Sequence, residues 1–305
     1  MDSINSSEKF ENALKCLCPK LKSDLKDIPE NIKSLATEIR LKVGKQPLII
    51  YKNNNYFLNP SNLISSEDIS QCVKIMCNYS VYSFQEQLKE GFITINGGNR
   101  VGICGTAIIR DGNIEGIKNI TSLNIRIARE FEGCSEKIFE IIKNSNGGVL
   151  IAGPPGCGKT TILRDLSRII STDKEFFKKV TVVDERMEIG SCFEGNIQMD
   201  IGLSDILSGF PKGEGILRAT RCLSPDVIVC DEIGSEKDAL SILQSLNSGV
   251  RIIASVHARN KTELLGKPQI KKLLNSGAFE NIIFMNNSES LGSIKNICKA
   301  CDLNA

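Results

Sequence analysis

The chain has 305 residues, a formal net charge of +2, and 41% hydrophobic and 24% charged residues. This composition is ordinary for a globular protein with room for about two domains, and the near-neutral charge argues against direct binding of nucleic acid. No apolar run approaches the roughly 18 residues of a membrane-spanning helix, the first residues are polar, and the 12 cysteines are scattered. We therefore expect a cytoplasmic protein with reduced thiols and without a transmembrane segment.

The first part of the chain mixes helical and strand-like patterns. The predicted elements are, in chain order, a helical region broken near Pro19 and Pro29 (8–39), two short strands around Gly44 (38–51), one or two helices (67–89), a hairpin (91–107) and, after a turn at Asp111-Gly112, further strand-like sequence (117–128). This mixture predicts a smaller α+β N-terminal domain over residues 1–130, followed by a linker over 131–146.

From residue 147 onward, strand and helix patterns alternate. The predicted strands are 148–152, 180–184, 226–230, 250–256 and 281–285, and the predicted helices are 159–170, 214–222, 235–247 and 261–275. Because strands that alternate with helices form βαβ units, residues 147–305 predict a parallel α/β sheet. Its chemistry is expected at the carboxyl ends of the strands.

A phosphate-loop motif is the strongest signal in the chain. Residues 153–160 match G-x-x-x-x-G-K-[ST] without a mismatch, between an apolar strand and a helix start. The backbone N–H groups of such a loop hold phosphate, the lysine reaches the β- and γ-phosphates, and the hydroxyl binds Mg²⁺. We therefore expect ATP and Mg²⁺ as cofactors. The residues expected to bind the nucleotide are Gly153, Pro154, Pro155, Gly156, Cys157, Gly158, Lys159, Thr160 and Thr161.

Polar residues also follow three other predicted strands. Glu185 follows the strand at 180–184, Asp231 and Glu232 follow the strand at 226–230, and His257 follows the strand at 250–256. With Thr160, Asp231 is expected to hold Mg²⁺, and a nearby glutamate can deprotonate the attacking water. His257, the single histidine of the chain, is expected to contact the γ-phosphate or its sensing network.

In this order, the four segments resemble the hexameric ATPases of type II and type IV secretion systems and their pilus-motor relatives. The acidic box of that superfamily would lie at 184–188 and its histidine box at 255–258. Several stretches are more similar to one branch, the stage III sporulation protein AA family of endospore-forming bacteria. These stretches are EIRLKVG (38–44), NRVGICGT (99–106), SLNIRIARE (122–130) and DVIVCDEIG (226–234).

The resemblance implies a RecA-like P-loop ATPase domain and a homo-oligomer, most simply a hexamer. It also implies docking at the cytosolic face of a membrane complex, on membrane-embedded channel or secretion proteins of the sporulation apparatus. Arginines of the N-terminal domain and linker would approach the γ-phosphate. The candidates by position are Arg100, Arg126 and Arg129, with Arg218 and Arg221 where relatives carry further arginines.

Some alternatives remain open at this point. The superfamily often has Gly-Glu where this chain has Asp231-Glu232, which leaves open whether Glu185 or Glu232 is the general base. An ABC-type ATPase is an alternative because Leu207-Ser-Gly partly matches that family's signature. An AAA+ ATPase is a second alternative because it has the same phosphate-loop sequence, although that family needs a polar sensor residue at the position of His257. A scaffold that binds ATP with little turnover is a third.

Overall fold

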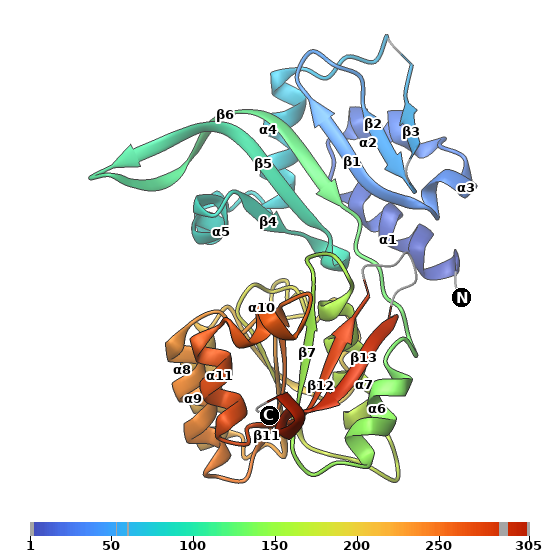
Figure 1. Ribbon diagram of the computed structural model, residues 1–305. Helices are drawn as coiled ribbons and strands as arrows, with labels where there is room; N and C mark the ends of the chain where they lie inside the picture. The colour runs from blue at the N-terminus through green and yellow to red at the C-terminus, as the bar shows by residue number, and fades with distance from the viewer. Residues whose placement is uncertain (1–2, 53, 60, 287–291, 304–305) are drawn as a thin grey trace. The chain divides into compact units, whose positions relative to one another are not determined.

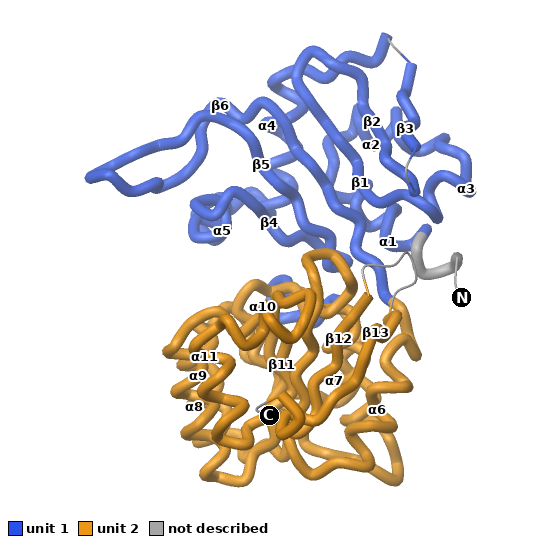
Figure 2. Tube along the Cα trace, viewed as in Figure 1, with its two compact units in different colours: residues 1–130, 192–198 blue, residues 131–191, 199–305 orange. Residues whose placement is uncertain are grey.

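The computed structural model describes residues 3–52, 54–59, 61–286 and 292–303. The chain divides into two compact units, which Figure 2 colours separately. Unit 1 comprises Met1–Glu130 and Cys192–Gln198, and unit 2 comprises Phe131–Ser191 and Met199–Ala305. The phosphate-loop motif and the acidic and histidine boxes belong to unit 2.

Unit 1 is built on a six-stranded sheet in the order β3-β2-β1-β6-β5-β4, in which every neighbouring pair is antiparallel (Figure 1). The strands are β1 (Ala36–Lys42), β2 (Leu48–Tyr51), β3 (Asn54–Phe57), β4 (Phe92–Thr94), β5 (Arg100–Arg110) and β6 (Asn113–Arg126). The helices are α1 (Ser3–Lys15), α2 (Pro19–Lys26), α3 (Glu30–Lys33), α4 (Ser66–Met76), η1 (Val81–Phe84), α5 (Gln85–Lys89) and η2 (Asn96–Gly98). Their apolar faces form one buried core with the sheet. The α+β prediction for this region is confirmed.

Prolines mark helix starts in unit 1, as the sequence predicts. Pro19 is the first residue of α2 and Pro29 is the N-cap of α3, because proline lacks an N–H group and its fixed φ suits a helix start. The prediction of helix up to residue 39 is wrong, since β1 begins at Ala36 and pairs with both β2 and β6. Strand β3 was not predicted; its residues are mostly exposed and polar.

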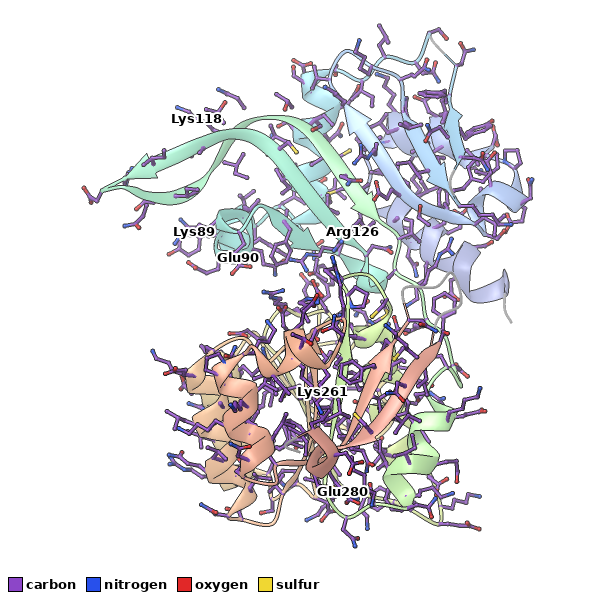
Figure 3. All side chains as sticks on the ribbon, viewed as in Figure 1. Lys89, Glu90, Lys118, Arg126, Lys261 and Glu280 are labelled. Atoms are coloured by element: carbon purple, nitrogen blue, oxygen red, sulfur yellow. The ribbon has the colours of Figure 1, made fainter. Side chains whose placement is uncertain are left out.

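Strands β5 and β6 form a long hairpin around the predicted turn. Asp111 and Gly112 have φ values of 49° and 78°, which is the left-handed conformation that a tight hairpin turn requires. From Cys104 to Arg110 every residue of β5 is exposed, and Figure 3 labels Lys118 on the returning strand.

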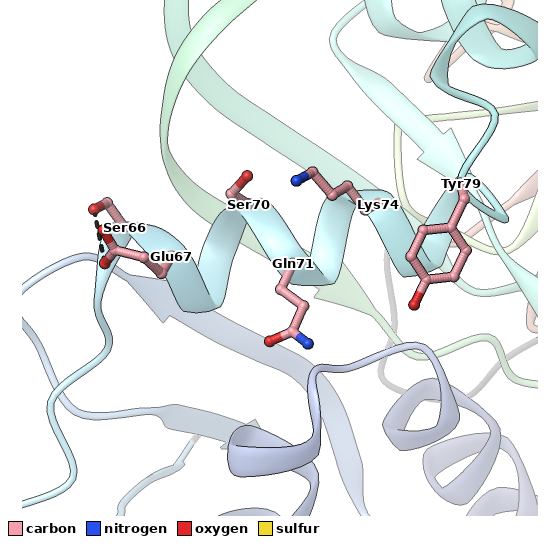
Figure 4. A pocket seen from close by; sticks show the side chains of 6 residues that line it. All are labelled: Ser66, Glu67, Ser70, Gln71, Lys74 and Tyr79. Carbon is pink, nitrogen blue, oxygen red and sulfur yellow. Dashed lines mark hydrogen bonds between the residues drawn. The ribbon is translucent and has the colours of Figure 1, made fainter.

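Unit 1 also has a pocket along α4 and the segment that follows it. The pocket is lined by Ser66, Glu67, Ser70, Gln71, Lys74 and Tyr79 (Figure 4). None of these residues belongs to the predicted nucleotide site.

Unit 2 contains a seven-stranded sheet in the order β13-β12-β7-β11-β10-β8-β9. The strands are β7 (Gly148–Gly153), β8 (Val180–Asp184), β9 (Asp205–Ser208), β10 (Val227–Cys230), β11 (Arg251–His257), β12 (Phe279–Met285) and β13 (Ile294–Lys299). The helices are α6 (Glu136–Lys143), α7 (Lys159–Thr172), α8 (Lys212–Cys222), α9 (Glu236–Leu246), α10 (Lys261–Leu265), α11 (Pro268–Asn275) and η3 (Ala300–Leu303). All neighbouring pairs are parallel except β12 and β13. This confirms the predicted parallel α/β sheet.

Both faces of the unit 2 sheet are covered. In β7, Leu150 and Ala152 belong to one buried cluster with α8, α9 and α11, while Val149 and Ile151 belong to a second cluster with α6 and α7. Burial on both faces explains why these strands read as continuous apolar runs rather than as alternating patterns. The parallel pairing of β7, β11, β10 and β8 brings their carboxyl ends to one side of the sheet.

Some predictions for unit 2 need correction. The single helix predicted over 261–275 is two helices, because Pro268 can start α11 but cannot continue α10. Strands β9 and β13, both at the sheet edges, were not predicted. Leu207 and Ser208, which suggested the ABC-type signature, lie in β9 and pair with β8.

Candidate nucleotide-binding and hydrolysis site

The phosphate loop joins the end of β7 to the start of α7. Gly156 and Gly158 have φ values of 74° and 92°, which residues with a Cβ atom rarely adopt. A Cβ atom on Gly153 would lie 2.6 Å from Cys157 Sγ and 3.0 Å from Met285 Cβ. The shape of the loop therefore requires glycine at all three positions, and the predicted strand–loop–helix is present.

Lys159 is held inside this loop. Lys159 is 6% exposed, and its Nζ donates to the main-chain oxygens of Gly153 at 3.0 Å and Pro154 at 2.8 Å. Nζ also lies 3.1 Å from His257 Nδ1. Burial lowers the pKa of Lys159, and the nearby Cys157 and Asp231 act in the opposite direction.

The two residues predicted to bind Mg²⁺ are in direct contact. Thr160 Oγ1 donates to Asp231 Oδ2 at 2.9 Å. The other carboxylate oxygen of Asp231 accepts from Ser255 Oγ at 2.5 Å and from the amide of Glu232 at 2.8 Å. A hydroxyl and a carboxylate are the hard oxygen ligands that Mg²⁺ prefers, so this pair fits the ion.

His257 lies between Lys159 and Glu232. Its Nδ1 lies 3.1 Å from Nζ of Lys159. Nε2 lies 3.5 Å from Glu232 Oε2, and Arg186 donates to the same oxygen at 3.1 Å. The ring therefore connects the phosphate-loop lysine to one of the two candidate bases.

The acidic box is a turn organised by Asp184. This side chain is buried, and its carboxylate accepts from the amides of Glu188, Ile189 and Gly190 at 2.9–3.1 Å. Burial raises the pKa of Asp184, and these amides counteract it. Arg164 of α7 donates to the main-chain oxygens of Glu188 and Ile189, each at 2.7 Å. Asp184 therefore stabilises the turn.

Glu185 has a different environment. Its side chain is 41% exposed, and Oε2 lies 3.3 Å from Nζ of the buried Lys212. Arg164, Arg186 and Lys212 are cations of this site that the sequence analysis missed. Arg186 lies within the acidic box itself, whereas Arg164 and Lys212 lie outside all motifs.

The candidate arginines of unit 1 have individual environments. The guanidinium of Arg100 lies 3.6 Å from the ring centre of Phe92, and Arg129 donates to the main-chain oxygen of Leu35 at 2.6 Å. Arg126 is exposed at the end of β6 (Figure 3). In unit 2, Arg218 pairs with Glu214 at 3.4 Å and is 52% exposed. Contact of these arginines with a γ-phosphate stays a prediction.

Comparison with known proteins identifies the family. Residues 7–302 match the family described as "Sporulation stage III, protein AA". The chain belongs to this family. Stage III sporulation protein AA of Bacillus subtilis (strain 168) is 36% identical over 281 residues, which cover 91% of this chain and 91% of that protein.

Solved structures show the fold of this family member. The pilus retraction motor PilT with bound ADP aligns with a TM-score of 0.60 and 17% identity, over 90% of this chain and 81% of that chain. The ATPase DotB of Legionella pneumophila aligns with a TM-score of 0.56 and 16% identity, over 84% and 73%. The chain therefore has the fold of PilT and DotB, with a RecA-like P-loop domain. In the portion of the chain that the structure describes, no helix is both long and apolar enough to cross a bilayer.

Proposed function

We propose that this protein is a Mg²⁺-dependent ATPase and that unit 2 carries its chemistry. The observation that supports this most directly is the connected set of contacts at the carboxyl ends of the strands in the unit 2 sheet. Thr160 reaches Asp231, and Lys159 is linked through His257 to Glu232. These are the groups that a triphosphate, its Mg²⁺ and an attacking water need in one place.

In the proposed reaction, the phosphate-loop amides hold the β- and γ-phosphates, and Lys159 exchanges its carbonyl partners for phosphate oxygens. Thr160 and Asp231 would hold Mg²⁺, and the bound ion would supply positive charge that neutralises these phosphates. Glu232 accepts a proton from water as the water oxygen bonds to the γ-phosphorus. The bond from that phosphorus to the bridging oxygen breaks, leaving ADP and inorganic phosphate. We favour Glu232 over Glu185 because of its link to Lys159 through His257.

We extend the proposal to a hexamer that acts at the cytosolic face of a membrane channel complex during spore formation. Membership of a sporulation family supports the process. Likeness to a pilus retraction motor and to type II secretion system protein E of Pectobacterium carotovorum, 21% identical over 79% of this chain, supports a motor role. The same membership favours this interpretation over the ABC-type and AAA+ alternatives.

The test is nucleotide binding and hydrolysis by the full chain with Mg²⁺. We expect saturable binding of a labelled ATP, and hydrolysis that falls about 100-fold or more in Lys159→Ala, because its cation stabilises charge in the transition state. Lys137→Ala, which removes an exposed lysine in the first turn of α6, is the matched control and should behave like the wild type.

The contrary outcomes are distinct. Absence of saturable binding by folded protein, or undiminished hydrolysis by Lys159→Ala, contradicts the proposal. Tight ATP binding without turnover in the assembled oligomer indicates the ATP-gated scaffold instead.

A further inference from the structure

Lys212 is a buried cation at a position where helices rarely place one. It is the first residue of α8, and it is 6% exposed. A positive charge at a helix N-terminus is disfavoured by the helix dipole, and burial of an ammonium group is unfavourable unless partners compensate it. The position of Lys212 therefore needs an explanation in terms of its partners.

Those partners are the two candidate bases. Nζ of Lys212 donates to the main-chain oxygen of Glu232 at 2.6 Å and to Glu185 Oε2 at 3.3 Å. One ammonium group thus contacts the backbone of one glutamate and the carboxylate of the other. It joins α8 to the ends of β8 and β10.

The backbone of Glu232 has an unusual conformation that these contacts help to hold. Its φ is 22°, a positive value that is strained for a residue with a side chain. Its N–H donates to Asp231 Oδ1 at 2.8 Å and to Ser255 Oγ at 3.0 Å, while its C=O accepts from Lys212. Polar partners therefore fix the peptide groups on both sides of the Glu232 Cα atom.

We infer that Lys212 is a positioning residue for ATP hydrolysis, which holds the Glu232 backbone and the Glu185 carboxylate in their places beside the Mg²⁺ ligand Asp231. This inference rests on the proposed function. Lys212 touches neither the phosphate loop nor the Thr160–Asp231 pair in the contacts above. Its loss should therefore impair turnover and leave nucleotide binding intact.

The experiment compares Lys212→Met with the wild type, because methionine keeps most of the apolar stem and removes the charge. We expect kcat to fall about 10- to 100-fold, since small misplacements of catalytic groups have effects of this size. KM for ATP and Kd for a labelled ATP with Mg²⁺ should stay within about twofold, because uniform binding is retained. Lys212→Arg keeps the charge, so its kcat should lie between those of Lys212→Met and the wild type.

Lys237→Met is the matched control, since Lys237 is an exposed lysine in the first turn of α9, a neighbouring helix of equal length. It should keep the wild-type kcat. In a double-mutant cycle, the effects of Lys212→Met and Glu185→Gln on kcat should be less than additive, because both variants remove the same contact between these two residues. If circular dichroism shows that Lys212→Met does not fold, Lys212→Gln replaces it. Its shorter, uncharged side chain loses the ion pair with Glu185, so kcat should again fall while Kd for ATP stays within about twofold.

The outcomes separate the two proposals. A wild-type protein that binds no ATP or does not turn it over overturns the ATPase proposal and this inference with it. An active wild type with an unchanged kcat in folded Lys212→Met overturns the inference alone. A parallel loss of ATP affinity in Lys212→Met also overturns it, because Lys212 would then belong to binding.

Discussion

Glu232 and Glu185 differ in what their carboxylates contact. The Glu232 side chain is 29% exposed and lies beside His257 and Arg186, and its backbone follows Asp231 directly. The Glu185 side chain is more exposed and pairs with Lys212. A base must be placed by its surroundings to receive a proton from one particular water, and the surroundings of Glu232 connect it to the phosphate loop.

Glu232→Gln should therefore lower kcat by about 100- to 10,000-fold, the range that a general base contributes, while Kd for ATP changes little. Glu185→Gln, an isosteric change at the other candidate base, should lower kcat less than about tenfold, through its contact with Lys212. Steady-state phosphate release and equilibrium ATP binding measure both effects. A larger loss in Glu185→Gln would reverse the assignment of the base.

Helix α7, which begins at the phosphate loop, also holds the segment that precedes α6. Asp165 is buried on this helix, and its carboxylate accepts from the amide and hydroxyl of Ser135 at 2.9 and 2.8 Å and from the amide of Gly133 at 3.2 Å. Arg168, one turn along α7, donates to it at 2.6 Å. These contacts fasten the segment before α6 to the helix that carries Lys159.

Asp165→Asn should lower the free energy of unfolding by about 1–3 kcal/mol at neutral pH. The hydrogen bonds that the buried carboxylate accepts become weaker when its negative charge is removed. Burial raises the pKa of Asp165, but the bonds from Arg168 and Ser135 outweigh it, so the net pKa is lowered. A folded-state pKa below the unfolded value, about 3.9, gives stability that is present above that value. This stability is lost as the pH falls through the folded pKa.

Urea unfolding at several pH values measures this effect. The wild type should lose more stability than Asp165→Asn on acidification below about pH 4, because only the wild type has this carboxylate to protonate. Asp205→Asn, which alters an exposed aspartate of the edge strand β9, should stay within about 0.5 kcal/mol of the wild type. Equal acid sensitivity of wild type and Asp165→Asn would contradict the role given to Asp165.

The two units of the molecule share more than one chain connection. Cys192–Gln198 is inserted in the sequence of unit 2 but belongs to unit 1 (Figure 2). There Gln198 accepts from the amide of Gly97 at 2.7 Å, and the rings of Phe193 and Phe84 lie 6.1 Å apart. The chain therefore leaves unit 2 directly after the acidic-box turn and returns to it at Met199.

For the whole molecule we predict that the specific activity per chain rises with protein concentration, because in the proposed hexamer we expect the neighbouring chain to complete the geometry of the site. Arg126→Ala should lower kcat about tenfold or more at full assembly, since it removes a charge that stabilises the transition state. Activity assays paired with sedimentation measure this. Arg110→Ala, at the exposed tip of the same hairpin, is the control. Activity independent of concentration would contradict the ring.

The amino-acid sequence alone predicts the phosphate loop and the alternating strands and helices of unit 2. The loop is contiguous, and its glycines and helix start specify its shape locally; the buried strands are apolar throughout because helices cover both faces. It could not predict the edge strands β9 and β13, since short edge strands carry weak patterns. The fold was therefore largely predictable, apart from edges and helix ends.

The different roles of the site residues depend on contacts that form only in the folded protein. Asp184 and Glu185 are neighbours in the sequence, yet one is buried and bonds to main-chain amides while the other reaches solvent and Lys212. His257 meets Lys159, and Lys212 meets Glu232, across distances along the chain that no local spacing rule encodes. These contacts exist because parallel strands bring their carboxyl ends to one edge, and that arrangement depends on the packing of the whole sheet.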